Sequence, residues 1–135
     1  MLTSLKRIPS PRGAVLRAMR ASDPGYEGFG EAYFSQVLPG CIKGWKRHRR
    51  MTLNLVVAAG AIRFVLHDGV DFQSMVLSPE SSETHKRLTV GPGLWMAFRG
   101  EGDSVSTLLN IANIPHDPDE AENRDVEAFS WQWPC

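Results

Sequence analysis

Apolar residues recur at every second position in several short runs of this chain. In residues 61–67, Ile62, Phe64 and Leu66 fall on one face of an extended backbone, and polar or smaller residues fall on the other. Asp68-Gly69 follows directly and is a strong turn signal. The segment therefore predicts a strand that ends in a tight turn.

Similar runs predict strands elsewhere, each bounded by Gly, Pro, Asp or Ser. They lie at residues 14–19, 31–38, 42–48, 51–58, 72–77, 87–90, 94–98 and 105–113. No long segment has a 3.6-residue apolar period, so we expect few helices. Short strands at even spacing are typical of an all-β sandwich or barrel, and a jelly roll would protect the strand edges.

The last segment, residues 115–135, has a different composition. Asp117 or Asp119 precedes further acidic residues and is positioned to cap one short helix. Trp131 and Trp133 are expected to pin the tail onto the barrel, with a flap or a contact between subunits as alternatives. There is no internal repeat or linker, so we expect residues 1–135 to form a single domain.

Composition narrows the functional classes. Lys and Arg number 15, as do Asp and Glu, and this zero net charge argues against a nucleic-acid partner. Cys41 and Cys135 do not have the spacing of a metal site or of a disulfide framework. No stretch approaches the ~20 apolar residues that cross a bilayer, so we expect no membrane partner and a cytoplasmic protein.

Residues 43–50 concentrate positive charge within one predicted strand. By strict alternation Lys46, His48 and Arg50 would share a face. Like charges that converge on a concave surface need an anion, and a ligand phosphate would supply one. A solvated basic strand or a nuclear-localisation-like patch is the alternative, but the interleaved Trp45 and nearby glycines favour a binding site.

Four ordered segments resemble the dTDP-4-dehydrorhamnose 3,5-epimerase family, a group of cupin-type nucleotide-sugar epimerases and isomerases. The resemblance runs from about Gly30 to Trp131. The matching segments are PGCIKGW at 39–45, VVAAGAIRFVLHD at 56–68, VGPGLWMAF at 90–98 and NIPHDPDEAE at 113–122.

The resemblance implies a cupin-type jelly-roll barrel, usually a homodimer, that acts on nucleotide-linked 4-keto-6-deoxy sugars. Its chemistry removes a proton next to the ketone, stabilises the enolate and returns the proton. No cofactor is expected, because the keto group already serves as the electron sink. No metal is expected either, because Lys46 stands at the position of the first metal-binding histidine of cupins and His48 alone cannot hold a divalent ion.

The chain departs from the family at the catalytic positions. Lys46 occupies the position of the catalytic histidine, and Asn110 occupies that of the tyrosine acid. His48 matches the second histidine of the related 3,4-ketoisomerases and is a candidate base, as is Lys46. Tyr33, from an adjoining strand, is a candidate acid.

These residues lead to three hypotheses. The first is an epimerase or isomerase, either of the 3,5-epimerase type or a 3,4-ketoisomerase. Its catalytic residues would be His48, Lys46 and Tyr33, and its substrate-binding residues would be Lys43, Arg50, Asn110 and Trp45. The second is a cupin that binds a nucleotide sugar without turnover. The third is an assembly partner in polysaccharide synthesis that contacts an acidic protein through the basic strand.

Overall fold

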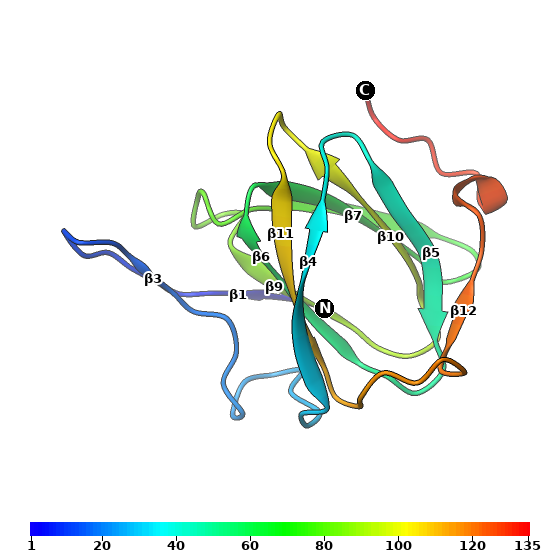
Figure 1. The fold of residues 1–135 in the computed structure, drawn as a ribbon, viewed down its shortest axis with the longest axis horizontal. Coiled ribbons are helices and arrows are strands. Elements are labelled where there is room, and N and C mark those ends of the chain that lie inside the picture. Colours follow the sequence, from blue (N-terminus) through cyan, green and yellow to red (C-terminus); the bar gives the residue numbers. More distant parts are fainter.

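The computed structural model describes residues 1–135 and contains two five-stranded antiparallel sheets that face each other (Figure 1). The first sheet has the order β1 (Leu2–Ser4), β9 (Lys86–Val90), β6 (Leu53–Ala59), β11 (Ser106–Ala112), β4 (Glu31–Val37). The second has the order β12 (Ala121–Asn123), β5 (Ile42–His48), β10 (Trp95–Glu101), β7 (Ala61–His67), β8 (Phe72–Leu77). A small hairpin, β2 (Arg7–Ile8) and β3 (Val15–Leu16), projects from the barrel. The predicted all-β fold is confirmed.

The longer strands with clear alternation were predicted well, and the short strands of two or three residues were not. The predicted segments 42–48, 61–67 and 72–77 coincide with β5, β7 and β8. The segment 14–19 contains only the two-residue β3, and β1, β2 and β12 were missed. These short strands contain too few residues to show a period, so only their pairing partners define them.

The helix predicted near Asp117 or Asp119 does not form. The carboxylate of Asp117 instead accepts a hydrogen bond from the backbone N–H of Asp119 at 3.0 Å, which shapes a turn. The chain's single helical element is a 3₁₀ turn, η1 (Val126–Ala128), which begins after Asp125. No helix has the length and hydropathy that crossing a bilayer requires.

The space between the sheets holds the main apolar core. Ile62, Phe64 and Leu66 of β7 all point into it, as their alternation predicted. From the opposite sheet Leu55 and Leu108 pack against them. Burial of such side chains contributes roughly 1.5–3 kcal/mol each, so this part of the barrel stabilises the fold.

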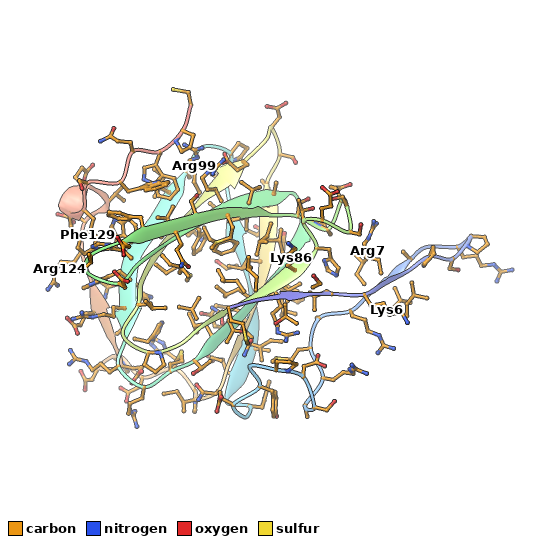
Figure 2. The ribbon with its side chains drawn as sticks, turned by 180° about the vertical axis from the view of Figure 1, so that it is seen from behind. Lys6, Arg7, Lys86, Arg99, Arg124 and Phe129 are labelled. Atoms are coloured by element: carbon orange, nitrogen blue, oxygen red, sulfur yellow. The ribbon has the colours of Figure 1, made fainter.

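A second cluster covers the outer face of the second sheet, and we call it the outer aromatic cluster. Its members are Trp45, Val65, Phe72, Trp95, Ala97, Phe129, Trp131 and Trp133. The prediction that the tail tryptophans pack onto the barrel is confirmed. Figure 2 shows Phe129 and Arg124 together at this edge of the molecule.

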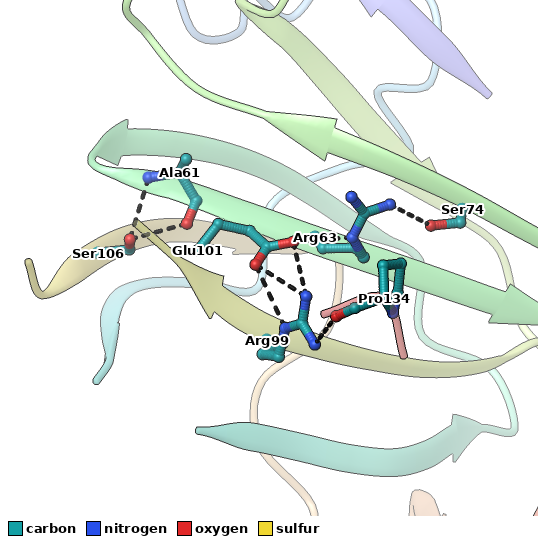
Figure 3. A network of polar contacts seen from close by, with 7 residues as sticks. All are labelled: Ala61, Arg63, Ser74, Arg99, Glu101, Ser106 and Pro134. Atoms are coloured by element: carbon teal, nitrogen blue, oxygen red, sulfur yellow. Dashed lines mark hydrogen bonds and ion pairs between the residues drawn. The ribbon is translucent and has the colours of Figure 1, made fainter. Parts of the chain in front are cut away.

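Polar contacts also tie the end of the tail to the second sheet (Figure 3). Glu101 accepts hydrogen bonds from Arg63 at 2.8 Å and from Arg99 at 3.0 Å. Arg99 in turn donates to the backbone carbonyl of Pro134 at 2.7 Å. The tail is therefore held at its aromatic side chains and near its last residue.

Candidate active site

A cavity of about 680 Å³ opens between the two sheets, at the end where β4 and β5 approach the C-terminal segment. Its floor is apolar and includes Leu53, Met96, Phe98 and Leu108. Its walls are polar and come from β4, β5, β11 and residues 116–123. This volume lies within the ~300–1,000 Å³ range of small-molecule sites.

Alternation along β4 and β11 supplies the first wall. Glu31, Tyr33 and Ser35 lie at every second position of β4 and all line the cavity. On β11 the inward row includes Leu108 and Asn110. Tyr33 and Asn110 are direct cross-strand neighbours, so their side chains meet on the cavity side.

A bulge in β5 supplies the second wall. Lys46 lies opposite Met96 and Lys43 lies opposite Phe98, so three steps along β5 match two along β10. Because of this extra residue, Lys43 and Lys46 both face the cavity although they are three positions apart. Gly44 makes the bulge possible, because its φ is 143° and a β-carbon there would lie 2.5 Å from the β-carbon of Ala97.

His48 lines the cavity at the end of β5. Its Nδ1 is buried and has no hydrogen-bond partner. Burial lowers the pKa of His48 from its ordinary value, and the neighbouring Lys46 ammonium lowers it further, against a smaller opposing effect of Glu120. The imidazole is therefore neutral at neutral pH and is able to take up a proton.

Tyr33 and Asn110 form a polar pair on the facing wall. The side-chain amide of Asn110 donates to the Tyr33 hydroxyl oxygen at 3.0 Å. Asn110 is only 6% exposed, and its Oδ1 is buried without a partner. Burial and the carboxylate of Glu31 raise the pKa of Tyr33, against the hydrogen bond from Asn110, so the phenol keeps its proton.

Lys43 is held in place at the other end of the cavity. Its ammonium donates to the backbone carbonyl of Gln36 at 2.6 Å and to the hydroxyl of Ser35 at 3.3 Å. An ammonium has three donors, so one remains for a ligand. Lys46 is exposed at the cavity wall, where its charge acts on His48.

Five of the seven sequence-predicted site residues come together, and two do not. Tyr33, Lys43, Lys46, His48 and Asn110 all line the cavity. The other two, Trp45 and Arg50, lie outside it.

Trp45 is only 1% exposed and belongs to the outer aromatic cluster, where its indole N–H donates to the Val126 carbonyl at 3.0 Å. Its ring lies on the face of β5 opposite Lys46 and His48, as alternation along the strand requires, and this corrects its expected place beside the substrate. Arg50 follows the end of β5, and its side chain is 68% exposed. It pairs with Glu120 at 3.2 Å and with Asp117 at 3.8 Å, so strict alternation did not extend to it.

Sequence reasoning also missed residues that line the cavity. Glu31 and Ser35 share the face of Tyr33, and the period of two in residues 31–35 was the signal that identifies them. His116 also lines the cavity, but no local pattern marks it, because only the path of the loop after β11 brings it there. Nowhere in the chain do three or more His, Cys, Asp or Glu side chains gather as a metal site would require.

Two facing antiparallel sheets with a polar-walled cavity define a cupin-type jelly-roll barrel with a ligand site. The structure is similar to that of a dTDP sugar isomerase from Desulfovibrio desulfuricans, with 34% identity, a TM-score of 0.89, and coverage of 95% of this chain and 85% of that chain. The chain therefore belongs to the family of dTDP-sugar isomerases and epimerases. The family expected from the sequence is confirmed.

More distant structures share the fold. A sugar 3,4-ketoisomerase from Thermoanaerobacterium thermosaccharolyticum, in complex with TDP, has 17% identity, a TM-score of 0.78, and coverage of 90% of this chain and 85% of that chain. A 4-keto-6-deoxy sugar epimerase from Streptomyces spheroides has 16% identity, a TM-score of 0.82, and coverage of 98% of this chain and 73% of that chain. No family model matches the sequence, and no curated protein matches it.

Proposed function

We propose that this protein is an epimerase or isomerase of a 4-keto-6-deoxy hexose linked to dTDP or a similar nucleotide, in surface polysaccharide or deoxysugar biosynthesis. The observation that carries the proposal is the pairing, across one cavity, of a neutral His48 with the protonated phenol of Tyr33. A base and an acid on opposite walls are what proton removal next to a ketone requires. The related structures are named as a dTDP sugar isomerase, a sugar 3,4-ketoisomerase and a 4-keto-6-deoxy sugar epimerase, and these activities support the same class of enzyme.

Substrate binding is assigned to the lysines. Lys43, fixed by Ser35 and Gln36, has one donor left for a diphosphate oxygen, and Lys46 adds a second positive charge on the same wall. Trp45 and Arg50 are not assigned to substrate binding, because neither lines the cavity.

The chemical step uses His48 as the base. A ring nitrogen of His48 takes the proton from the carbon next to the ketone, and the C–H electron pair forms an enolate with its charge on the keto oxygen. Tyr33 donates its hydrogen bond to that oxygen, and the ammonium of Lys46 stabilises the charge. A solvent-exchangeable proton then adds to the opposite face of that carbon, which inverts its configuration, and His48 releases the proton that it took to solvent. His48 rather than Lys46 is assigned as the base, because the His48 ring lines the cavity and burial lowers its pKa, whereas Lys46 is exposed. The carbonyl accepts the electrons, so the proposed reaction needs no cofactor.

A 3,4-ketoisomerase is the alternative supported by a specific observation, namely that His48 faces the cavity from the position of the second ketoisomerase histidine. The first step would be the same. A proton would then add to the former carbonyl carbon, and the hydroxyl proton of the carbon that lost its hydrogen would move to the former keto oxygen, so that this neighbouring carbon becomes the new ketone.

Incubation with a dTDP-4-keto-6-deoxy sugar in deuterated water tests the proposal. We expect deuterium at C3 or C5, measured by NMR, and the position of the carbonyl in the product separates epimerase from ketoisomerase. Tight binding without exchange would instead indicate a non-catalytic binding protein. Neither binding nor exchange would leave the role of an assembly partner.

We further propose that the protein works as a homodimer in the cytoplasm. Apolar side chains stand exposed on β4, where Phe34 is 69% exposed, and on the projecting hairpin, where Val15 is 55% exposed. Such surface is costly unless a partner covers it. Both cysteines are free, which fits a reducing compartment. Light scattering after size-exclusion chromatography should give twice the mass of the chain, and Phe34→Glu should shift it toward the monomer.

A further inference from the structure

We infer that Tyr33 and Asn110 together recognise an α-hydroxy ketone. Tyr33 donates to the keto oxygen, and Oδ1 of Asn110 accepts a hydrogen bond from the hydroxyl on the adjacent carbon. The inference rests on the proposed function for the identity of the ligand. It adds a requirement that epimerisation itself does not impose, namely a free hydroxyl beside the ketone at C3.

The burial of Asn110 is the first part of the argument. The residue is 6% exposed, and its Oδ1 has no hydrogen-bond partner in the protein. A buried carbonyl oxygen without a partner destabilises the protein, because the oxygen has lost its hydrogen bonds to water, and such groups are rare. Because Asn110 lines the cavity, a ligand that offers a donor there would remove this cost.

The orientation of the amide is the second part. The Nδ2 of Asn110 donates to the Tyr33 oxygen at 3.0 Å, which orients the whole amide group. The register between β4 and β11, with Tyr33 directly opposite Asn110, keeps the two side chains together. The amide therefore presents its oxygen, rather than its nitrogen, as the free group.

The phenol is the third part. Its oxygen already accepts a hydrogen bond from Asn110, so the hydroxyl hydrogen remains for a different acceptor. The pair thus presents one donor and one acceptor side by side in the same cavity. An α-hydroxy ketone carries the complementary groups on adjacent carbons, an acceptor carbonyl and a donor hydroxyl.

A double-mutant cycle between protein and ligand tests the inference. The ligands are dTDP-4-keto-6-deoxyglucose and its 3-deoxy analogue, and the binding constants are measured by titration calorimetry. The proteins carry His48→Asn to prevent turnover, with Asn110 either retained or replaced in Asn110→Leu. Loss of the 3-hydroxyl should weaken binding by roughly tenfold or more when Asn110 is present, since a polar group of the site is left unpaired. The same loss should be less than about threefold in Asn110→Leu.

Asn123→Leu is the matched control, because Asn123 also lines the cavity but from β12 on the opposite sheet. It should keep the full discrimination between the two ligands. If Asn110→Leu lowers the thermal midpoint of unfolding, Asn110→Ala serves as a second variant. It should show the same small ratio between the dissociation constants of the 3-deoxy analogue and the parent sugar. Equal ratios with Asn110, Asn110→Leu and Asn110→Ala would overturn the inference and leave the proposed function intact. If the parent sugar neither binds nor exchanges with the unaltered protein, the proposed function fails and the inference fails with it.

Discussion

The two faces of β5 differ in whether their polar side chains find partners within the protein. On the outer face, Trp45 is buried and hydrogen-bonded to Val126, and Arg47 pairs with both carboxylate oxygens of Glu122 at 3.0 Å while covering the Trp95 ring. On the inner face, His48 has a buried ring nitrogen without a partner. Trp45 and Arg47 on the outer face thus find their partners within the protein, whereas His48 on the inner face keeps a ring nitrogen that the protein does not satisfy.

The largest expected effect comes from the inner face. His48→Ala removes the proposed base and should reduce deuterium exchange into the substrate by about 10²–10⁴-fold. His85→Ala is the control, because His85 is buried outside the cavity and contacts the Arg17 carbonyl at 3.0 Å. It should reduce stability but leave exchange per folded molecule within about twofold. Similar exchange rates in the two variants would mean that β5 presents the wrong face to the substrate.

A substitution on the outer face of β5 should instead lower the stability of the protein. Trp45→Ala removes a buried ring that packs edge-on against Phe129 with centroids 5.2 Å apart, and it should lower the free energy of unfolding by about 3–5 kcal/mol. Lys46→Ala, one residue along the strand, should change it by less than about 0.5 kcal/mol, because Lys46 is exposed. Urea denaturation measures both values. Equal losses would show that the two faces do not divide their roles in this way.

Lys43→Ala should produce a smaller effect that is confined to binding. A phosphate clamp acts in the ground state and the transition state alike, so we expect the dissociation constant of the substrate to rise about tenfold with little change in kcat. Lys6→Ala, which removes a lysine outside the cavity, is the control and should leave both constants unchanged. A pure loss of kcat in Lys43→Ala would contradict its assignment.

The smallest effect concerns pH. Burial and the Lys46 charge lower the pKa of His48 below its ordinary 6.5. The base is inactivated by protonation, so exchange should persist at pH 6.5 and be lost only as the pH falls through the lowered pKa. Lys46→Ala removes one cause of the shift, which raises the pKa of His48 and moves the acid limb of kcat/KM to higher pH. A limb that moves downward, or not at all, would show that Lys46 does not act on His48.

The strands and the family could be recognised from the sequence because they depend on local patterns. The alternation in residues 61–67 is strong, since a strand has only two faces and Ile62, Phe64 and Leu66 on one of them fill the main apolar core. The same rule, applied to residues 31–35, identifies the inward row of Glu31, Tyr33 and Ser35. Local periodicity therefore determined which segments are strands and much of what β4 contributes to the cavity.

Tertiary structure decided the rest of the site. The bulge at Gly44 depends on the close approach of β10, and it turns Lys43 to the cavity, the face opposite to the one that alternation from Lys46 predicts. The carboxylate of Glu120 draws Arg50 away, although it lies 70 residues further along the chain. Whether a polar group is satisfied depends on neighbours that are distant in sequence, so no linear pattern could show that His48 and Asn110 each keep a buried atom free.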